Sequence, residues 1–235
     1  KVQLINEGFL LMENGRYKKA DEEWIPILES KTFWQFDHRF ATYEGVPLSA
    51  MEAGQCRSLS SDEKLSPNII PVARLWLDKD TVEHYTSWHH CQYWVAYRDI
   101  TNSTNERTTV SVILPRQATD YTVRLIYGDK IRGVYAGCLV AMLNAIAFDF
   151  VAKQSVAGTH FSDYIMKQLP VLPPSTYDQL CPWTGADHAS RITYQHFILS
   201  RVLELTYTAW DLQAFAHDCG YDGPPFIWDE ERRFL

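Results

Sequence analysis

The sequence predicts an α+β fold with a mixed β-sheet, packed helices and a helical C-terminal segment. Four stretches in the first half are rich in β-branched and aromatic residues and are bounded by Pro, Asp or Gly, which is typical of strands. After residue 133 the apolar residues recur at helical spacing instead. The chain has 235 residues, 46% of them hydrophobic, so it can bury a sizeable core. The four expected strands cover 69–77, 92–98, 108–114 and 121–127.

A hairpin and one further strand are expected near the N-terminus. Asn14 and Gly15 tolerate positive φ angles, so they predict a type I′ turn between residues 9–12 and a strand from Tyr17. Pro26 cannot donate a hydrogen bond to a neighbouring strand, which favours an edge strand over 24–28.

A short helix should follow, because Ser30 is a suitable N-cap and Phe33, Phe36 and Phe40 would then share one apolar stripe. Residues 46–69 are expected to form a loop.

The second half predicts helices as scaffold. Long helices are expected over 133–153 and 194–218, the second ended by Gly220, with a short helix over about 160–168 and an extended proline run between them. Asp229 is a suitable N-cap for a last helix, which the sequence cuts short before an apolar face is complete. Since the chain also lacks an initiator Met, we expect it to be a piece of a larger protein.

Composition limits the function classes. The net charge of −7 argues against a generic nucleic-acid binder, but the acidity is concentrated after residue 201, while residues 93–135 carry six basic and four acidic side chains. That sector could face phosphates. The longest apolar stretch, 134–150, is short and is interrupted by Asn144 and Asp149, so no membrane span is expected. Without a signal-peptide pattern or a CxxC pair, a cytoplasmic location with reduced thiols is expected.

No complete active site is evident. His89-His90-Cys91 is the densest ligand-like cluster, but adjacent strand residues point to opposite faces and no second Cys/His pair has zinc spacing. There is no phosphate-binding glycine loop and no nucleophile motif. We therefore expect no catalytic and no metal-binding residue, and a self-contained hydrolase is the least favoured reading.

A recognition loop is the stronger candidate. The residues Asn102, Thr104, Asn105 and Arg107 offer amides, a hydroxyl and a guanidinium, the groups that read base edges in DNA. The alternative is an ordinary capped turn, since Asn and Thr side chains also bond to their own backbone. The aromatic residues of 33–40 could likewise stack on bases or lie in the core.

Four segments together resemble a known family. They are WIPILESKTFWQFDHRFATYEG (24–45), YRDITNSTNERTTVSVILPR (97–116), MLNAIAFDFVAKQSVAGTHFSDYIMKQLPVLPP (142–174) and RVLELTYTAWDLQAFAHDCGYDGPPFIWDEERRFL (201–235). In that order they resemble the C-terminal specificity region of large N6-adenine DNA methyltransferases of bacterial restriction-modification and phage-defence systems. The segment QLPVLPP also resembles the sequence that closes target recognition domains in restriction specificity subunits.

The resemblance implies a target recognition domain over 1–175 and a truncated helical segment over 176–235. It implies sequence-specific binding of double-stranded DNA, with the catalytic domain, its NPPY-type motif and its S-adenosylmethionine lying upstream. This chain has Pro173-Pro174 but no Asn-Pro-Pro-Tyr and no glycine-rich cofactor loop, so no cofactor is expected in this fragment. Its own upstream methyltransferase domain and other subunits of the defence system are further expected partners.

The expected DNA contacts lie on three loops around 31–43, 98–108 and 153–160. They are Lys31, Gln35, His38, Arg39, Arg98, Asn102, Thr104, Asn105, Arg107, Lys153, Thr159 and His160. Arg98 and Lys153 are the expected phosphate contacts. The main alternative is a protein-interaction module that uses the acidic C-terminal helices to dock another subunit of the same system.

Overall fold

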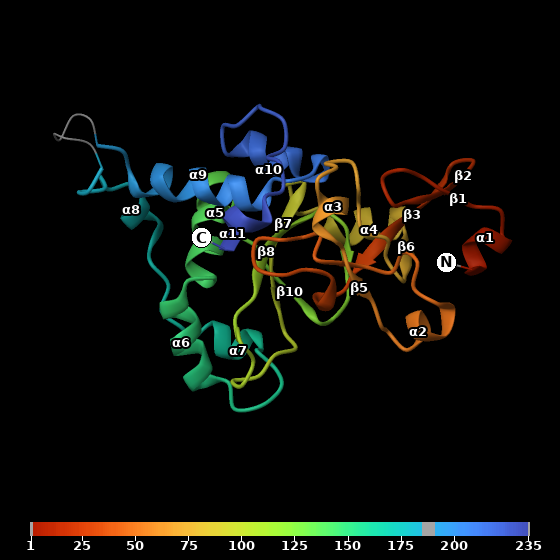
Figure 1. The fold of residues 1–235 in the computed structure, drawn as a ribbon, viewed down its shortest axis with the longest axis horizontal. Helices are drawn as coiled ribbons and strands as arrows, with labels where there is room; N and C mark the ends of the chain where they lie inside the picture. The colour runs from red at the N-terminus through yellow and green to blue at the C-terminus, as the bar shows by residue number, and fades with distance from the viewer. Residues whose placement is uncertain (1, 185–190, 235) are drawn as a thin grey trace.

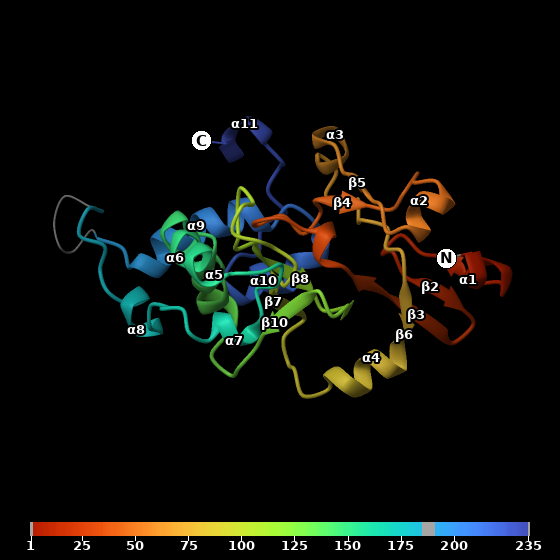
Figure 2. The same ribbon diagram turned by 90° about the horizontal axis from the view of Figure 1, so that it is seen from below.

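The computed structural model describes residues 2–184 and 191–234 and confirms the α+β class (Figures 1 and 2). A five-stranded sheet has the order β1-β2-β3-β6, with β9 pairing parallel to β3. A three-stranded antiparallel sheet has the order β10-β7-β8, and β4 pairs with β5. The strands are β1 (Leu10–Leu11), β2 (Tyr17–Lys19), β3 (Glu22–Leu28), β4 (Ala41–Thr42), β5 (Arg57–Ser58), β6 (Trp76–Asp78), β7 (Tyr93–Arg98), β8 (Ser111–Pro115), β9 (Ala118–Thr119) and β10 (Val123–Ile126).

The helices that follow residue 133 gather at one end of the molecule, while the N-terminal sheet and the first helices of the chain lie at the opposite end (Figure 1). The α-helices are α1 (Val2–Asn6), α2 (Leu48–Glu52), α3 (Ser61–Lys64), α4 (Lys79–Thr86), α5 (Gly133–Leu143), α6 (Ile146–Ser155), α7 (Asp163–Met166), α8 (Pro174–Tyr177), α9 (Tyr194–Thr206), α10 (Gln213–Asp218) and α11 (Glu230–Phe234). Two 3₁₀ turns are also described: η1 (Ser30–Thr32) lies between β3 and β4, and η2 (Trp210–Leu212) lies between α9 and α10.

The predicted N-terminal hairpin forms between β1 and β2, but not through a type I′ turn. Gly15 has a φ of 75°, whereas Asn14 is not among the non-glycine residues with positive φ. A type I′ turn needs positive φ at both central residues. The loop is instead closed by the Met12 N–H, which donates to the Arg16 carbonyl at 2.8 Å.

β3 is a central strand, so the expected edge position is wrong. It pairs with β2 as far as Trp24 and with β9 from Ile27, and only β6 pairs with Pro26, through Trp76. Pro26 therefore lies where the sheet offers no second neighbour, and its missing N–H costs no hydrogen bond.

The aromatic segment after β3 is not the helix that the sequence predicts. It forms the short turn η1, whose N-cap is Glu29, and Phe36 then adopts a φ of 59°. Phe33 enters the core, and Trp34 stacks on Phe40 with ring centroids 5.6 Å apart. The expected loop over 46–69 contains α2, β5 and α3.

The three-stranded sheet carries the main core on both faces. Tyr93, Val95 and Ile113 pack against α5, α9 and α10, while Trp94 and Val112 pack with Phe33 on the other face. The C-terminal helices thus pack on the first part of the chain. Residues 185–190 of the expected C-terminal segment lie outside the described residues.

The approach of α5 to α9 depends on a glycine. A Cβ atom on Gly137 would lie 2.9 Å from Cδ1 of Leu199. Such a contact is shorter than packed carbon atoms accept, so the two helices can come this close only because position 137 has no side chain.

Both predicted long helices are broken. α5 and α6 are bent by 62° at Asn144 and Ala145, and Ile146 and Phe150 are 78% and 65% exposed, so they do not continue the expected buried stripe. Residues 207–209 separate α9 from η2 and α10. Among residues 2–184 and 191–234, no single helix is long and apolar enough to cross a membrane.

The structure agrees better with the predicted ends of the last two helices. Gly220 has a φ of 80° and follows α10, where the Tyr221 N–H donates to the Ala216 carbonyl at 2.9 Å, as in a Schellman motif. Asp229 Oδ1 accepts a hydrogen bond from the Arg232 N–H at 2.9 Å, which confirms it as the N-cap of α11.

Candidate nucleic-acid interface

Two loops that the sequence places about fifty residues apart are joined at one end of the molecule. The Thr101 N–H donates to the Thr159 carbonyl at 3.1 Å, and the Phe161 N–H donates to the Asp99 carbonyl at 2.7 Å. Ile100 and His160 form an isolated antiparallel bridge. The connection between β7 and β8 thus lies beside the connection between α6 and α7, at the lower end of Figure 1. We call these two connections, 99–110 and 156–162, the loop pair.

The loop pair and the adjoining helix α6 bring together most of the predicted DNA contacts. The residues that it unites are Asn102, Thr104, Asn105, Arg107, Lys153, Thr159 and His160. Of these, Thr104, Asn105, Thr159 and His160 are exposed.

The tip of the first loop is a turn held by Asn102. Its Oδ1 accepts hydrogen bonds from the Thr104 N–H at 2.9 Å and from the Thr104 hydroxyl at 2.7 Å. This is the turn capping that the sequence left open as an alternative. Among the described residues, the Asn105 side chain makes one hydrogen bond, a long one of 3.4 Å from Nδ2 to the Thr101 hydroxyl. Its amide therefore remains available at the surface.

Side chains of helix α6 and the main chain of Asn144, just before it, anchor this loop. The buried Asp149 carboxylate accepts hydrogen bonds from the N–H groups of Thr108 and Thr109 at 2.8 and 2.6 Å. Arg107 donates to the Asn144 carbonyl, and its Nε lies 3.8 Å from Asp149 Oδ2. The side chain of Arg107 is only 16% exposed. Arg107 therefore fastens the loop to α6, and these contacts favour an anchoring role over its expected role as a base-reading side chain.

Lys153 is also engaged within the protein. Its Nζ donates to the Glu106 carbonyl at 2.9 Å and lies 3.7 Å from Asp149 Oδ2. Its side chain is 29% exposed, so the ammonium group stands at the edge of the loop pair and braces it.

A charged cluster that the sequence did not predict joins the two loops to β10. Asp99, which is buried, has Oδ2 at 3.0 Å from His160 Nδ1 and at 3.2 Å from Arg124 Nη2. The hydrogen bond to Asp99 raises the pKa of the Arg124 guanidinium. The sequence offered one signal, because an Asp directly after a buried strand sits at the strand end, where loops begin.

Three other predicted contacts, on the 31–35 segment and at the end of β7, are engaged within the protein. Arg98 donates to the Phe33 carbonyl, and its guanidinium carbon lies 4.7 Å from the centre of the Trp34 ring. Burial lowers the pKa of Arg98 to about 10. Gln35 donates to the Thr109 carbonyl at 2.9 Å, and Lys31 donates to the Gly54 carbonyl at 2.7 Å. Arg98 is thus a packed cation rather than the expected free phosphate contact.

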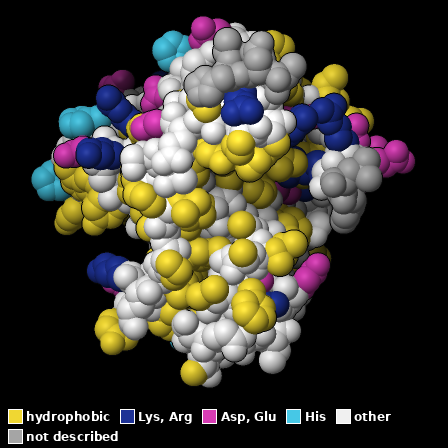
Figure 3. Space-filling view, turned by 90° about the vertical axis from the view of Figure 1, so that its left-hand side faces the viewer, with side chains coloured by type: hydrophobic (Ala, Val, Ile, Leu, Met, Phe, Trp, Pro, Cys, Tyr) yellow, Lys and Arg dark blue, Asp and Glu magenta, His cyan; other side chains and the backbone are white. Residues whose placement is uncertain are grey.

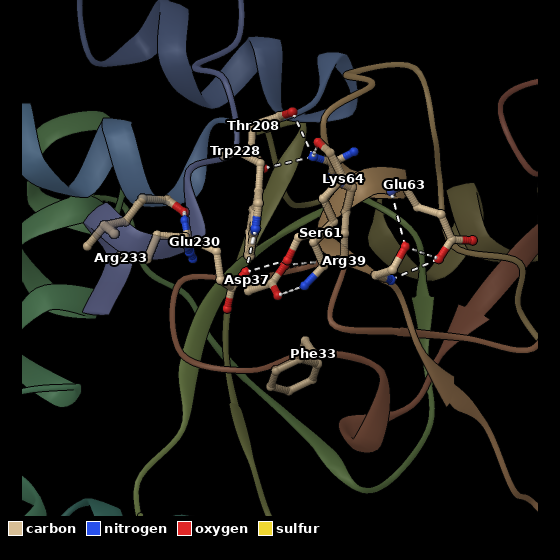
Figure 4. Close-up of polar contacts among 12 residues, drawn as sticks. Phe33, Asp37, Arg39, Ser61, Glu63, Lys64, Thr208, Trp228, Glu230 and Arg233 are labelled. Carbon is tan, nitrogen blue, oxygen red and sulfur yellow. Dashed lines mark hydrogen bonds and ion pairs between the residues drawn. The ribbon is translucent and has the colours of Figure 1, made fainter. Parts of the chain in front are cut away.

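Arg39 and His38 are interior residues, which corrects their expected place on a DNA-contacting loop. Arg39 is fully buried and donates to the carbonyls of Lys64, Ser66, Ile69 and Thr208. Figure 4 shows Arg39 between α3 and Thr208. His38 is 5% exposed, and its Nε2 lies 2.9 Å from Asp211 Oδ1. A guanidinium with so many carbonyl partners joins distant segments and cannot reach solvent.

The histidine and cysteine cluster of 89–91 has a packing role at His89. This ring stacks on Trp94 with centroids 4.1 Å apart, and its Nε2 bonds to the Tyr93 carbonyl at 2.9 Å. Burial, followed by the nearby charge of Arg116, lowers the pKa of His89 against the opposing hydrogen bond to Tyr93. Within residues 2–184 and 191–234, no group of three or more His, Cys, Asp or Glu side chains is placed to hold a metal ion.

Comparison with protein-family models, with curated proteins and with solved structures found no match to this chain.

Proposed function

We propose that this chain recognises double-stranded DNA through the loop pair, as the C-terminal specificity fragment of an adenine-specific DNA methyltransferase of a restriction-modification or phage-defence system. The observation that supports this is the main-chain bond between Thr101 and Thr159, which joins two separately predicted loops into one polar surface. Both loops are anchored by buried carboxylates, Asp99 and Asp149. A surface that is fixed before binding loses little entropy when DNA is bound.

The chemistry of this surface suits base edges. Asn105 presents an amide on the exposed tip, and an amide can bond to adenine in two places. The Thr104 hydroxyl gives its proton to Asn102, so it offers a base its oxygen as an acceptor. In this proposal Thr104 and Asn105 read bases, and Asn102 shapes the turn that presents them.

The proposal keeps catalysis outside this chain. The upstream domain would bind S-adenosylmethionine and methylate a flipped adenine, while this fragment holds the duplex. The chain alone should then not bind S-adenosylmethionine and should not methylate DNA. A calorimetric binding signal with the cofactor would contradict the proposal that cofactor binding lies in the upstream domain.

A salt titration of duplex binding tests the proposal. We expect the chain to bind a mixed-sequence duplex weakly and to lose affinity steeply between low and physiological salt, because phosphate contacts release counterions. Fluorescence anisotropy with a labelled duplex measures this. A chain that shows no affinity for duplex DNA at low salt, in a preparation that melts cooperatively, would rule the proposal out.

A specific observation favours a second function, the docking of another protein. Hydrophobic side chains gather on the face seen in Figure 3, which is the left-hand side of Figure 1, where α6, α8 and α9 lie. Exposed apolar residues of this part include Ile146, Phe150, Val171, Leu172 and Phe197. Contiguous apolar surface of this kind is typical of protein contacts.

In the setting proposed above, the partner would be the upstream methyltransferase domain. Phe150→Ser should then weaken association with that domain, supplied as a separate protein, and leave duplex affinity unchanged. If the wild-type chain and Phe150→Ser associated equally with the upstream domain, Phe150 would be excluded from such a contact.

A further inference from the structure

Asp99 is a buried carboxylate that holds two exposed cationic side chains. It follows β7 and is 1% exposed, whereas the side chains of His160 and Arg124 are 57% and 38% exposed. Among the described residues, its Oδ1 has no hydrogen-bond partner. Burying a carboxylate is unfavourable unless cations or donors compensate it, so His160 and Arg124 are what make this position tolerable.

The arrangement leaves donors directed away from Asp99. A carboxylate only accepts, so Nδ1 of His160 carries the proton of the 3.0 Å bond. Nε2 lies on the other side of the imidazole ring and has no partner within the part of the chain that the structure describes. Arg124 uses one of its N–H groups on Asp99 at 3.2 Å. Because both side chains bind the same oxygen, their bonded nitrogens lie within about 6 Å of each other.

The charge of this cluster depends on the protonation of His160. With His160 protonated, two cations face one carboxylate, and with His160 neutral the charges of Arg124 and Asp99 cancel. One further carboxylate, that of Asp163, also acts on the charge of Arg124. Asp163 on α7 is paired with Lys167 at 3.4 Å, and burial raises the pKa of Tyr97 to about 12. An anion that binds here should therefore favour the protonated form of His160.

We propose that Asp99 is a positioning residue that presents His160 and Arg124 as a proton-linked binding site for a phosphate group of the DNA backbone. The inference rests on the proposed function and adds to it which groups hold the backbone. A phosphodiester offers only acceptors, which matches two side chains that offer only donors when both are charged. The cations that the sequence assigned to phosphate, Arg98 and Lys153, are engaged in internal contacts.

The test is the affinity of the chain for a mixed-sequence duplex at pH 6 and pH 8, measured by anisotropy. We expect roughly tenfold tighter binding at pH 6, which is what one additional charge-assisted contact supplies. His160→Gln keeps a polar side chain that cannot be protonated, and it should bind with nearly equal affinity at the two pH values. His84→Gln, which changes an exposed histidine on α4, is the matched control and should retain the wild-type pH response.

Two further variants test the other members of the cluster. Arg124→Gln should reduce the slope of log affinity against log salt by about 1, the change expected for one lost phosphate contact. Asp99→Asn should weaken the pH response while both cations remain. If Asp99→Asn unfolds the chain, the pH response of His160→Gln still tests the phosphate site, because the His160 side chain is largely exposed and its replacement should not unfold the chain.

The outcomes separate this inference from the proposed function. Salt-dependent duplex binding that is equal at pH 6 and pH 8, or a pH response that survives in His160→Gln, would overturn the phosphate site and leave DNA recognition standing. A change in preference between sequences in His160→Gln would show a base contact instead, and would also overturn it. Absence of duplex binding at every salt concentration would overturn both.

Discussion

The side-chain amide of Asn144 pairs with the main chain of Ser111 as a neighbouring strand would. Its Oδ1 accepts from the Ser111 N–H at 2.9 Å, and its Nδ2 donates to the Ser111 carbonyl at 2.8 Å. Asn144 is also the residue at which α5 ends, and its own carbonyl accepts from Arg107. One residue therefore fixes the bend between α5 and α6, the first residue of β8 and the base of the loop pair.

Asn144→Ala should be strongly destabilising. The Ser111 N–H is buried and would lose its acceptor, whereas the Ser111 carbonyl would still accept from the Phe36 N–H. We expect the free energy of unfolding to fall by about 1–3 kcal/mol, the usual cost of one unsatisfied buried group. Urea unfolding measures this, with Asn68→Ala as a control on an exposed asparagine that should change stability by less than about 0.5 kcal/mol. Equal midpoints for the two variants would contradict this account.

Arg107→Ala should lower stability rather than alter sequence preference. The side chain is mostly buried and joins the loop to α6 through Asn144 and Asp149. We expect a loss of about 1–3 kcal/mol in the free energy of unfolding, because Asp149 would lose a nearby cation and the Asn144 carbonyl a donor. Thermal melting measures the loss. In the full-length methyltransferase that we propose, an Arg107→Ala variant with normal stability and a changed set of methylated sites would support Arg107 as a base reader.

Asn105→Ala should alter sequence preference and leave stability nearly unchanged, the reverse of Arg107→Ala. The Asn105 amide is exposed and makes one long hydrogen bond, so stability should change by less than about 0.5 kcal/mol. In the full-length methyltransferase that we propose, binding to the true site should weaken by about 1–3 kcal/mol and the preference at one base pair should relax. Methylation of single-base variants of the site measures this.

Asn102→Ala serves as the comparison for that experiment. It removes the acceptor that shapes the turn, so it should lower stability by about 1 kcal/mol. If Asn105→Ala instead destabilised the chain and kept the wild-type site preference, the loop would be a capped turn and no more.

The sequence predicted the strands of the three-stranded sheet well, because their signal is local. β7 and β10 lie within the expected ranges, and β8 extends one residue beyond its range. Almost every residue of β7 and β8 is buried, which is why these runs are apolar and β-branched. The helix break at Asn144 could not be predicted from the local sequence, because the partner of its amide is 33 residues earlier in the chain.

The candidate site was predicted in part for the same reason. The hydrogen-bonding character of 101–108 is visible in the sequence, but whether a polar side chain faces solvent depends on distant partners. Arg39 finds one of its acceptors at Thr208, and Arg98 finds Trp34. Periodicity also misled the prediction for 30–40, since Phe33 and Phe40 are buried or stacked without helical geometry.

Lys64→Met should destabilise the contact between α3 and the C-terminal segment. The Lys64 Nζ lies 2.6 Å from Asp37 Oδ2 and 4.0 Å from the centre of the Trp228 ring, and Lys64 is 5% exposed (Figure 4). Removing the cation leaves the Asp37 carboxylate buried and without its ion-pair partner, which typically costs about 3–5 kcal/mol.

Lys79→Met is the matched control for that variant. Lys79 pairs with Glu23 at 3.0 Å, but its side chain is 34% exposed, so its loss should cost less than about 1 kcal/mol. Chemical denaturation of both variants makes the comparison. If Lys64→Met and Lys79→Met lowered the free energy of unfolding by similar amounts, burial would not decide the strength of these ion pairs.

Acid should weaken the fold through Glu29. This buried carboxylate accepts from the Tyr43 hydroxyl at 2.6 Å and from Arg74 at 2.8 Å. Burial is the largest influence on the pKa of Glu29 and raises it, but these hydrogen bonds and the charges of Lys31 and Arg74 together hold the pKa below its ordinary value. A lowered pKa means that the stabilisation is present above the ordinary pKa of glutamate, about 4.3, and is lost as the pH falls through the lower value of the folded state.

We therefore expect the free energy of unfolding to fall as the pH is lowered from 5 to 3, and to fall less in Glu29→Gln. At pH 7 the variant should be less stable than the wild-type chain, because the amide cannot replace a carboxylate between Arg74 and Tyr43. Protonation of Glu29 in the wild-type chain should then narrow the difference towards pH 3. Urea unfolding at several pH values measures both chains, with Glu83→Gln, an exposed glutamate on α4, as the control that should follow the wild-type decline. A difference between wild type and Glu29→Gln that stays constant from pH 7 to pH 3 would show that the ionisation of Glu29 contributes nothing to acid unfolding.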